Sequence, residues 1–332
     1  FTHGGDLTIY GNTDGTQNAS TSVGVKIEGN TSYKPNLSTE SGKIEITGYG
    51  GVSVNETGSS SQNHGIEIAN ATLETTTGDI TLEGRSGENS SSSGSVGGVG
   101  VKLYSGTIIK TYAADPTNFT PKIEITGYGG DGTSINDGIG LYGTIESQVG
   151  QIILKGHRGS GSGDYGIYIS NGIIDSKGNS PMHLVSYSDG NSESFYVHSS
   201  TIGGTGNTSG VHFYTDFPIN KSVDSSNFLD NSSVSGTSRT LDSSIFSGST
   251  ITGLDGQITF EPTSSYDSEI SEINENVGTS STDVGIDIDF DDLVDEIETE
   301  QIVVTEESIG LESMFDFGDE GDEAISITFG DG

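Results

Sequence analysis

The chain of 332 residues contains no cysteine and no tryptophan, and its 12 lysines and arginines face 48 aspartates and glutamates. Without cysteine, disulfide bonds and thiolate metal sites are excluded. The formal net charge of −36 argues against a nucleic-acid partner, because phosphate binding requires clustered basic side chains. No run approaches the ~18 consecutive apolar residues of a membrane-spanning helix, so the sequence predicts no membrane span.

Glycine is abundant instead, with 51 residues, and it frames a repeated motif. The motif reads Gly-(Asp/Lys/Gln)-Ile-x-(Ile/Leu)-x-Gly and is complete at 42–48, 78–84 and 150–156. If Leu7, Ile44, Ile80, Ile123 and Ile152 are its equivalent positions, the spacings are 37, 36, 43 and 29 residues. Repetition at ~20–50 residues is typical of a solenoid, in which each unit covers the apolar face of its neighbour.

Each unit contains three segments in which apolar and polar residues alternate, the pattern of a strand with one buried face. An insert rich in glycine, serine and asparagine follows the first segment, and its length varies between units. Three short strands per turn with one insert-tolerant corner predict an all-β fold, a right-handed parallel β-helix. We expect the glycines at corners that need positive φ and leave no room for a Cβ atom.

The repeat becomes irregular after about residue 180, and the composition changes near residue 263. We predict a β-helix over residues 1–262 and an acidic tail over 263–332. Residues 261–332 hold 23 aspartates and glutamates and no basic residue, which is typical of a solvated, mobile tail. The alternative is that strand-like tail segments pair with an exposed sheet edge, including that of a neighbouring subunit. The residues predicted to do so are Ile302, Val304, Ile325, Ile327 and Phe329.

Aromatic and basic side chains follow the first strand of four units, at Tyr49, Arg85, Tyr128 and His157. In stacked coils they would form a row along one edge of the β-helix, and we consider this row a candidate binding site for a glycan. The alternative is that the row packs over the corner and its glycine-rich inserts. The six histidines show no metal-ligand spacing, and we expect them at surface or corner positions.

β-Helices also carry enzymes that act on polysaccharides, and such sites need close carboxylate pairs. The regular units contain no Asp-Asp or Asp-x-Asp pair, and outward residues such as Lys102 and Glu124 fit a solvated face, so we predict no enzymatic activity. Hard oxygen ligands in the tail are candidates for Ca²⁺, with diffuse counterion binding as the alternative. These candidates are Asp287, Asp289, Asp291, Asp319 and Asp322. No other cofactor is expected.

Two segments carry a resemblance to a known family: Gly-Asp-Ile-Thr-Leu-Glu-Gly at 78–84 and Gly-Ile-Tyr-Ile-Ser-Asn-Gly-Ile-Ile-Asp-Ser at 166–176. Joined by Gly/Ser/Asn inserts, they resemble the repeats of filamentous-haemagglutinin-like large exoproteins of the two-partner-secretion type, which are abundant in cyanobacteria. The resemblance covers about residues 1–260 and leaves out the N-terminal secretion domain of the family. It implies an extracellular adhesin or cell-surface fibre.

Phe1 enters directly into a repeat, so we expect a processed or partial product of a longer precursor. A second copy can continue a ladder of strands whose end is uncapped. We therefore predict an extracellular structural protein, a homo-oligomer or filament built by β-helix stacking or by exchange of tail strands. Two alternatives are a monomeric adhesin segment that binds glycans or another cell surface, and a polysaccharide-active enzyme.

Overall fold

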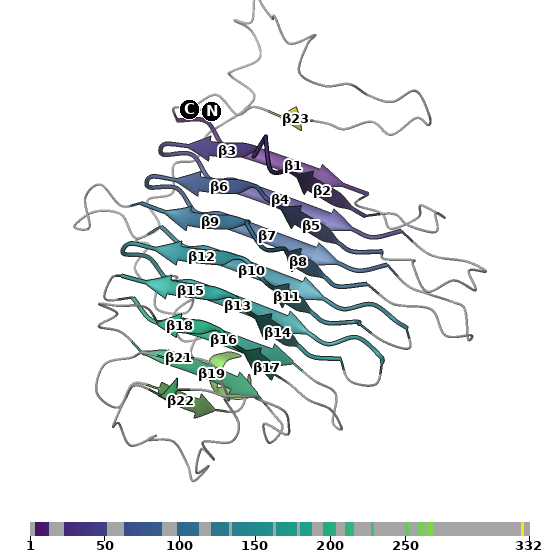
Figure 1. The fold of residues 1–332 in the computed structure, drawn as a ribbon, viewed down its shortest axis with the longest axis vertical. Helices are drawn as coiled ribbons and strands as arrows, with labels where there is room; N and C mark the ends of the chain where they lie inside the picture. The colour runs from purple at the N-terminus through teal and green to yellow at the C-terminus, as the bar shows by residue number, and fades with distance from the viewer. Residues whose placement is uncertain are drawn as a thin grey trace, which may run out of the picture. The chain divides into compact units, whose positions relative to one another are not determined.

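The computed structural model confirms the parallel β-helix, with strands stacked coil upon coil in three sheets (Figure 1). The chain divides into a unit of residues 1–269 with 325–332, and a unit of residues 270–324 that lies outside the described residues. The structure describes residues 4–12, 23–51, 63–87, 98–112, 121–132, 135–161, 164–177, 180–187, 195–203, 210–215, 227–228, 250–251, 258–261, 263–267 and 327–328.

Each sheet collects one strand from successive coils. In spatial order, the first sheet contains β22 (Ile258–Glu261), β19 (Val211–Thr215), β16 (Met182–Tyr187), β13 (Ile152–His157), β10 (Ile123–Tyr128), β7 (Ile80–Arg85), β4 (Ile44–Tyr49), β1 (Leu7–Gly11) and β23 (Ile327–Thr328). The second contains β17 (Phe195–His198), β14 (Ile167–Ser170), β11 (Ile139–Leu141), β8 (Val101–Leu103), β5 (Ile66–Ala69) and β2 (Val25–Glu28). The third contains β20 (Asn227–Phe228), β21 (Thr250–Ile251), β18 (Thr201–Gly203), β15 (Ile173–Ser176), β12 (Thr144–Ser147), β9 (Ile108–Thr111), β6 (Thr72–Thr75) and β3 (Asn36–Thr39).

The predicted register of the repeat is confirmed residue by residue in the first sheet. Leu7 pairs with Ile44, and Ile44 pairs with Ile80. Ile80 pairs with Ile123, and Ile123 pairs with Ile152, all between parallel strands. The side-chain period of a strand is two, so this register places every apolar residue of the motif on the same face. The result is a continuous column of aliphatic side chains inside the helix.

Six consecutive coils each contribute one strand to every sheet: coil one is β1–β3, coil two is β4–β6, and so on to coil six, β16–β18. The inward-facing aliphatic residues of coils two to five are 0% exposed, and complete burial of each contributes roughly 1.5–3 kcal/mol. In coil one, by contrast, Val25 is buried at 7% exposed, but the other inward-facing aliphatic residues are only partly buried. They are Leu7, Ile9, Ile27 and Leu37.

At the corner between strands one and two, the glycines are required by close backbone contact and their φ is not positive. A Cβ atom on Gly84 would lie 2.1 Å from the carbonyl oxygen of Gly100, and one on Gly127 would lie 2.0 Å from that of Gly138. The predicted positive φ occurs among the described glycines at Gly106, in the corner between β8 and β9, and at Gly203, the last residue of β18. The corner between strands one and two therefore brings two backbone segments together at a distance that only a hydrogen side chain permits.

The irregular region after residue 180 continues the same ladder. Coil six pairs with coil five, β19 pairs in parallel with β16, and β22 pairs in parallel with β19. A short helix at residues 263–267 places Tyr266, which is 3% exposed, against the rings of His183 and Tyr214. Residues 263–267 thus pack on the last coils, although the predicted tail begins at residue 263.

Candidate functional site

The four residues of the predicted row occupy equivalent positions in the structure. Tyr49, Arg85, Tyr128 and His157 are the last residues of β4, β7, β10 and β13, and each pairs with the next in parallel register. The register continues to Tyr187, the last residue of β16. We call these five residues the strand-end column. Sequence reasoning missed Tyr187 because Ser186 replaces the glycine that marks the motif in the other coils.

The side chains of the strand-end column stack on one another. The Arg85 guanidinium carbon lies 5.6 Å from the Tyr49 ring centroid and 4.9 Å from that of Tyr128. The His157 ring stacks between Tyr128 and Tyr187, with centroid distances of 4.4 and 4.3 Å. Each such contact contributes on the order of ~0.5–1.5 kcal/mol. The column therefore holds neighbouring coils together at the corner where the inserts begin.

The stacking limits what this column can bind. Sugar rings pack on the faces of aromatic rings, but the faces of the His157 ring are covered by Tyr128 and Tyr187. Burial, with contributions from Lys155 and Arg85, lowers the pKa of His157 to about 4, so its ring is neutral at pH 7. Within the column, Tyr128 and His157 each lie between two neighbours, and Arg85 is exposed to solvent. Its role in glycan binding stays a prediction.

A second aromatic group, which sequence reasoning missed, lies on the outer face of the second sheet. It contains Tyr104, Tyr142, Tyr165, Tyr168 and Tyr196, and we call it the tyrosine cluster. Tyr168 and Tyr196 are in register on β14 and β17, and their rings stack at 4.5 Å with an interplanar angle of 4°. Tyr168 and Tyr196 lie on strands of this sheet, whereas Tyr104 and Tyr142 directly follow β8 and β11, and Tyr165 precedes β14.

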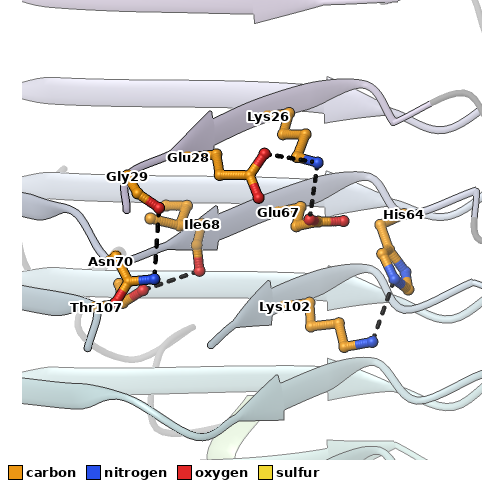
Figure 2. A network of polar contacts seen from close by, with 9 residues as sticks. All are labelled: Lys26, Glu28, Gly29, His64, Glu67, Ile68, Asn70, Lys102 and Thr107. Carbon is orange, nitrogen blue, oxygen red and sulfur yellow. Dashed lines mark hydrogen bonds and ion pairs between the residues drawn. The ribbon is translucent and has the colours of Figure 1, made fainter. Parts of the chain in front are cut away.

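Polar side chains occupy the same sheet nearer to coil one (Figure 2). The Lys26 ammonium forms ion pairs with Glu28 at 3.0 Å and with Glu67 at 3.6 Å. The His64 Nε2 atom lies 3.3 Å from the Lys102 Nζ atom. Lys102 is 8% exposed, so the prediction that it lies on a solvated face was wrong: its Nζ atom lies beside His64 and 4.8 Å from the Tyr104 ring centroid. Such pairing connects coils one, two and three.

His64 lies at a corner, as expected of a histidine in this sequence, but its side chain is fully buried. Its Nδ1 atom accepts a hydrogen bond from the backbone N–H of Val99 in the next coil, at 2.9 Å. Burial and the charges of Lys102 and Lys26 lower the pKa of His64 to about 3. The neutral ring is therefore a link between coils and is kept from acting as a base near neutral pH.

We expect the urea concentration at the midpoint of unfolding to fall as the pH is lowered from 6.5 towards 4. Burial lowers the pKa values of His64, His157 and His183 below their ordinary 6.5, so in this range the unfolded chain binds protons that the folded chain does not. Asp137 opposes this with one proton, because burial raises its pKa from 3.8 to about 7.

Replacing His64 by asparagine, whose side-chain oxygen can accept the same hydrogen bond, should flatten this pH dependence. Urea unfolding followed by circular dichroism at pH 7 and pH 5 measures it. An equal loss of stability in wild type and His64→Asn would contradict the assignment.

Two carboxylates from neighbouring corners are close together, although the sequence contains no adjacent pair in the regular units. The Asp137 Oδ1 atom accepts the backbone N–H of Tyr165 at 2.8 Å. Asp164 accepts the backbone and side-chain N–H groups of Asn136 at 3.0 and 2.9 Å. Burial raises the pKa of Asp137, and the charge of Asp164 adds to the rise. Both carboxylates are engaged by backbone N–H groups, which fits a structural role in joining coils.

The tail residues are largely outside the described part of the chain. This applies to the candidate Ca²⁺ ligands Asp287, Asp289, Asp291, Asp319 and Asp322, and to Ile302, Val304, Ile325 and Phe329. Ile327 and Thr328 form β23, which pairs antiparallel with β1 of the same chain, Ile9 facing Ile327.

Within the described residues, no three histidine, aspartate or glutamate side chains gather into a metal site. No helix in this part of the chain is long and apolar enough to cross a bilayer. Comparison with known proteins found no matching family model, no similar curated protein and no similar solved structure.

Proposed function

We propose that the chain is an extracellular structural protein, a β-helical segment of a cell-surface fibre or matrix. The observation that supports this proposal best is the continuous parallel ladder from β1 to β22. The buried histidine and aspartate side chains that could serve as acids or bases instead join coils through hydrogen bonds. His64 accepts the backbone N–H of Val99, Asp137 that of Tyr165, and Asp164 that of Asn136. This arrangement favours a stiff load-bearing element without enzymatic activity.

The proposed location rests on the composition and on the resemblance of the repeats. A cysteine-free, acidic chain needs no oxidative cross-link when strand ladders and apolar columns hold it together. The parallel β-helix agrees with the fold that filamentous-haemagglutinin-like exoproteins imply, which favours a role as a fibre or adhesin of that kind.

The surface of coil one offers a way to extend the stack. In the described part of the chain, β2 and β3 pair on one side only, with β5 and β6. Leu37 is half-buried, whereas its in-register partner Leu73 is 0% exposed. A further coil laid on coil one would bury these apolar side chains and pair the open strand edges. A second copy supplies such a coil by stacking, and β23 of a neighbour supplies a strand by exchange.

A charge placed in this layer is expected to prevent association of the chain. In Leu37→Lys the ammonium would have to be buried between coils, which is costly without a partner. The matched control is Asn36→Lys, because Asn36 is the preceding residue of β3 and faces outwards. Sedimentation velocity and negative-stain imaging over a concentration series should show growing rods for wild type and Asn36→Lys only. A wild type that stays monomeric, or a Leu37→Lys variant that assembles normally, would refute the proposal.

Truncation after residue 267 separates the two routes in the same experiment. If strand exchange joins the subunits, removal of β23 abolishes the rods. If coils stack directly, the truncated chain still forms them.

A further inference from the structure

Tyrosine is the most abundant side chain of this protein that one-electron oxidants attack readily. The chain has no cysteine or tryptophan and two methionines, against 13 tyrosines. Met182, the methionine within the described residues, is 0% exposed. One-electron oxidants in an extracellular setting would therefore react mainly with phenol rings. Five of these rings are gathered in the tyrosine cluster.

One pair in the cluster has the geometry for a covalent bond between coils. Tyr168 and Tyr196 face each other on neighbouring parallel strands, with ring centroids 4.5 Å apart and planes 4° from parallel. The π orbitals that carry the unpaired electron of a phenoxyl radical are perpendicular to the ring. In stacked parallel rings these orbitals overlap, so the carbons next to the two hydroxyl groups can bond.

The other contacts in the cluster are less suitable. Tyr104 and Tyr142 stack at 6.3 Å, and Tyr142 and Tyr168 are 5.7 Å apart with planes inclined by 43°. Tyr165 lies 5.3 Å from Tyr196, but the planes of these two rings are inclined by 51°. Among the tyrosine pairs that the structure describes, Tyr168 and Tyr196 thus combine the shortest separation with parallel planes.

We propose that Tyr168 and Tyr196 form a dityrosine cross-link between coils five and six under one-electron oxidation, for example by a peroxidase with hydrogen peroxide. Each phenol loses one electron and one proton, and the two radicals join through a carbon–carbon bond. The hydrogens on the bonded carbons then move to the oxygens, which restores both aromatic rings. One hydrogen peroxide accepts the two hydrogen atoms and becomes two water molecules.

The surroundings fit this chemistry. Burial raises the pKa of the Tyr168 phenol, and the neighbouring Tyr196 adds to the rise, so oxidation must release the phenolic proton. Both rings are half-buried and retain access to solvent, which can take that proton. The bond would join strands of neighbouring coils next to the region where the repeat becomes irregular. In a chain without cysteine it would serve the purpose of a disulfide.

The test is photo-oxidation of the dilute, folded full-length chain with ruthenium tris-bipyridyl and persulfate, followed by digestion and tandem mass spectrometry. A peptide pair joined at Tyr168 and Tyr196, two hydrogen atoms lighter than its parts, is the expected main intrachain product. Tyr168→Phe and Tyr196→Phe should each lose this product while keeping the far-ultraviolet circular dichroism of the fold. Tyr33→Phe should keep the product, although Tyr33 is 57% exposed.

Stacking must direct the reaction if the inference is correct. Oxidation in urea should therefore lose the selectivity for this pair. Dityrosine that joins exposed residues at random in the folded chain, or an unchanged intrachain yield in Tyr196→Phe, would overturn it. A dominant Tyr165–Tyr196 link, lost in Tyr165→Phe, would overturn the assignment of the pair.

Discussion

Gly127→Ala is expected to destabilise the β-helix by about 3 kcal/mol or more, because the added Cβ atom meets backbone that cannot move independently. That atom would lie 2.0 Å from the carbonyl oxygen of Gly138 and 2.7 Å from its carbonyl carbon. Gly138 in turn directly precedes β11, which pairs with β8 and β14 of the two neighbouring coils. Relief of the clash at one coil would therefore disturb the ladder on both sides.

Gly140→Ala is the matched control, since Gly140 lies in the same coil and on β11. Its Cβ atom would find its nearest neighbours at 3.5 Å or more, which is ordinary contact. We expect a change within ~1 kcal/mol, and a small gain is consistent with a less flexible unfolded chain. Guanidinium unfolding followed by circular dichroism compares the two variants. Equal midpoints would show that close approach at the corner does not constrain the fold.

Ile80→Ala should cost about 2–5 kcal/mol, because it removes buried methyl groups and leaves a cavity inside the column. Ile80 is 0% exposed and lies in register between Ile44 and Ile123, which are also fully buried. Neighbouring coils cannot close the cavity without breaking their own strand pairing, so we expect the upper part of this range.

Thr81→Ala controls for the change of strand residue, because Thr81 is the next residue of β7 and faces outwards. Its effect should stay within ~0.5 kcal/mol. Urea unfolding and amide hydrogen exchange of coils two to four measure both variants. If Ile80→Ala were as stable as Thr81→Ala, the aliphatic column would not be the main source of stability.

The sequence was most informative where one residue type repeats for one physical reason. Ile44, Ile80 and Ile123 were placed in the correct register because alternation and glycine spacing define the buried face of a strand. The same reasoning placed Arg85 beside Tyr49 and Tyr128. It missed Tyr187, because Ser186 interrupts the glycine pattern although the strand register continues unchanged.

Contacts between the corners of neighbouring coils could not be predicted from the sequence. His64 and Lys102 are separated by 38 residues, and their side chains meet only because coils two and three stack. The tyrosine cluster is another such case, because its rings come from several coils and occupy different positions relative to the second strand of each coil. Insert length shifts these positions along the chain, and no fixed spacing connects them.

The amino-acid sequence by itself was enough to predict a three-strand repeat with a buried aliphatic column. Strand periodicity is a local property, and it recurs in every repeat unit. Apart from the row that includes Tyr49, Arg85 and Tyr128, the tertiary structure alone decided which outward side chains touch one another. Stacking at the strand spacing converts residues about 30 positions apart into direct neighbours, and it thereby buries His64, covers the faces of His157 and places Tyr168 against Tyr196.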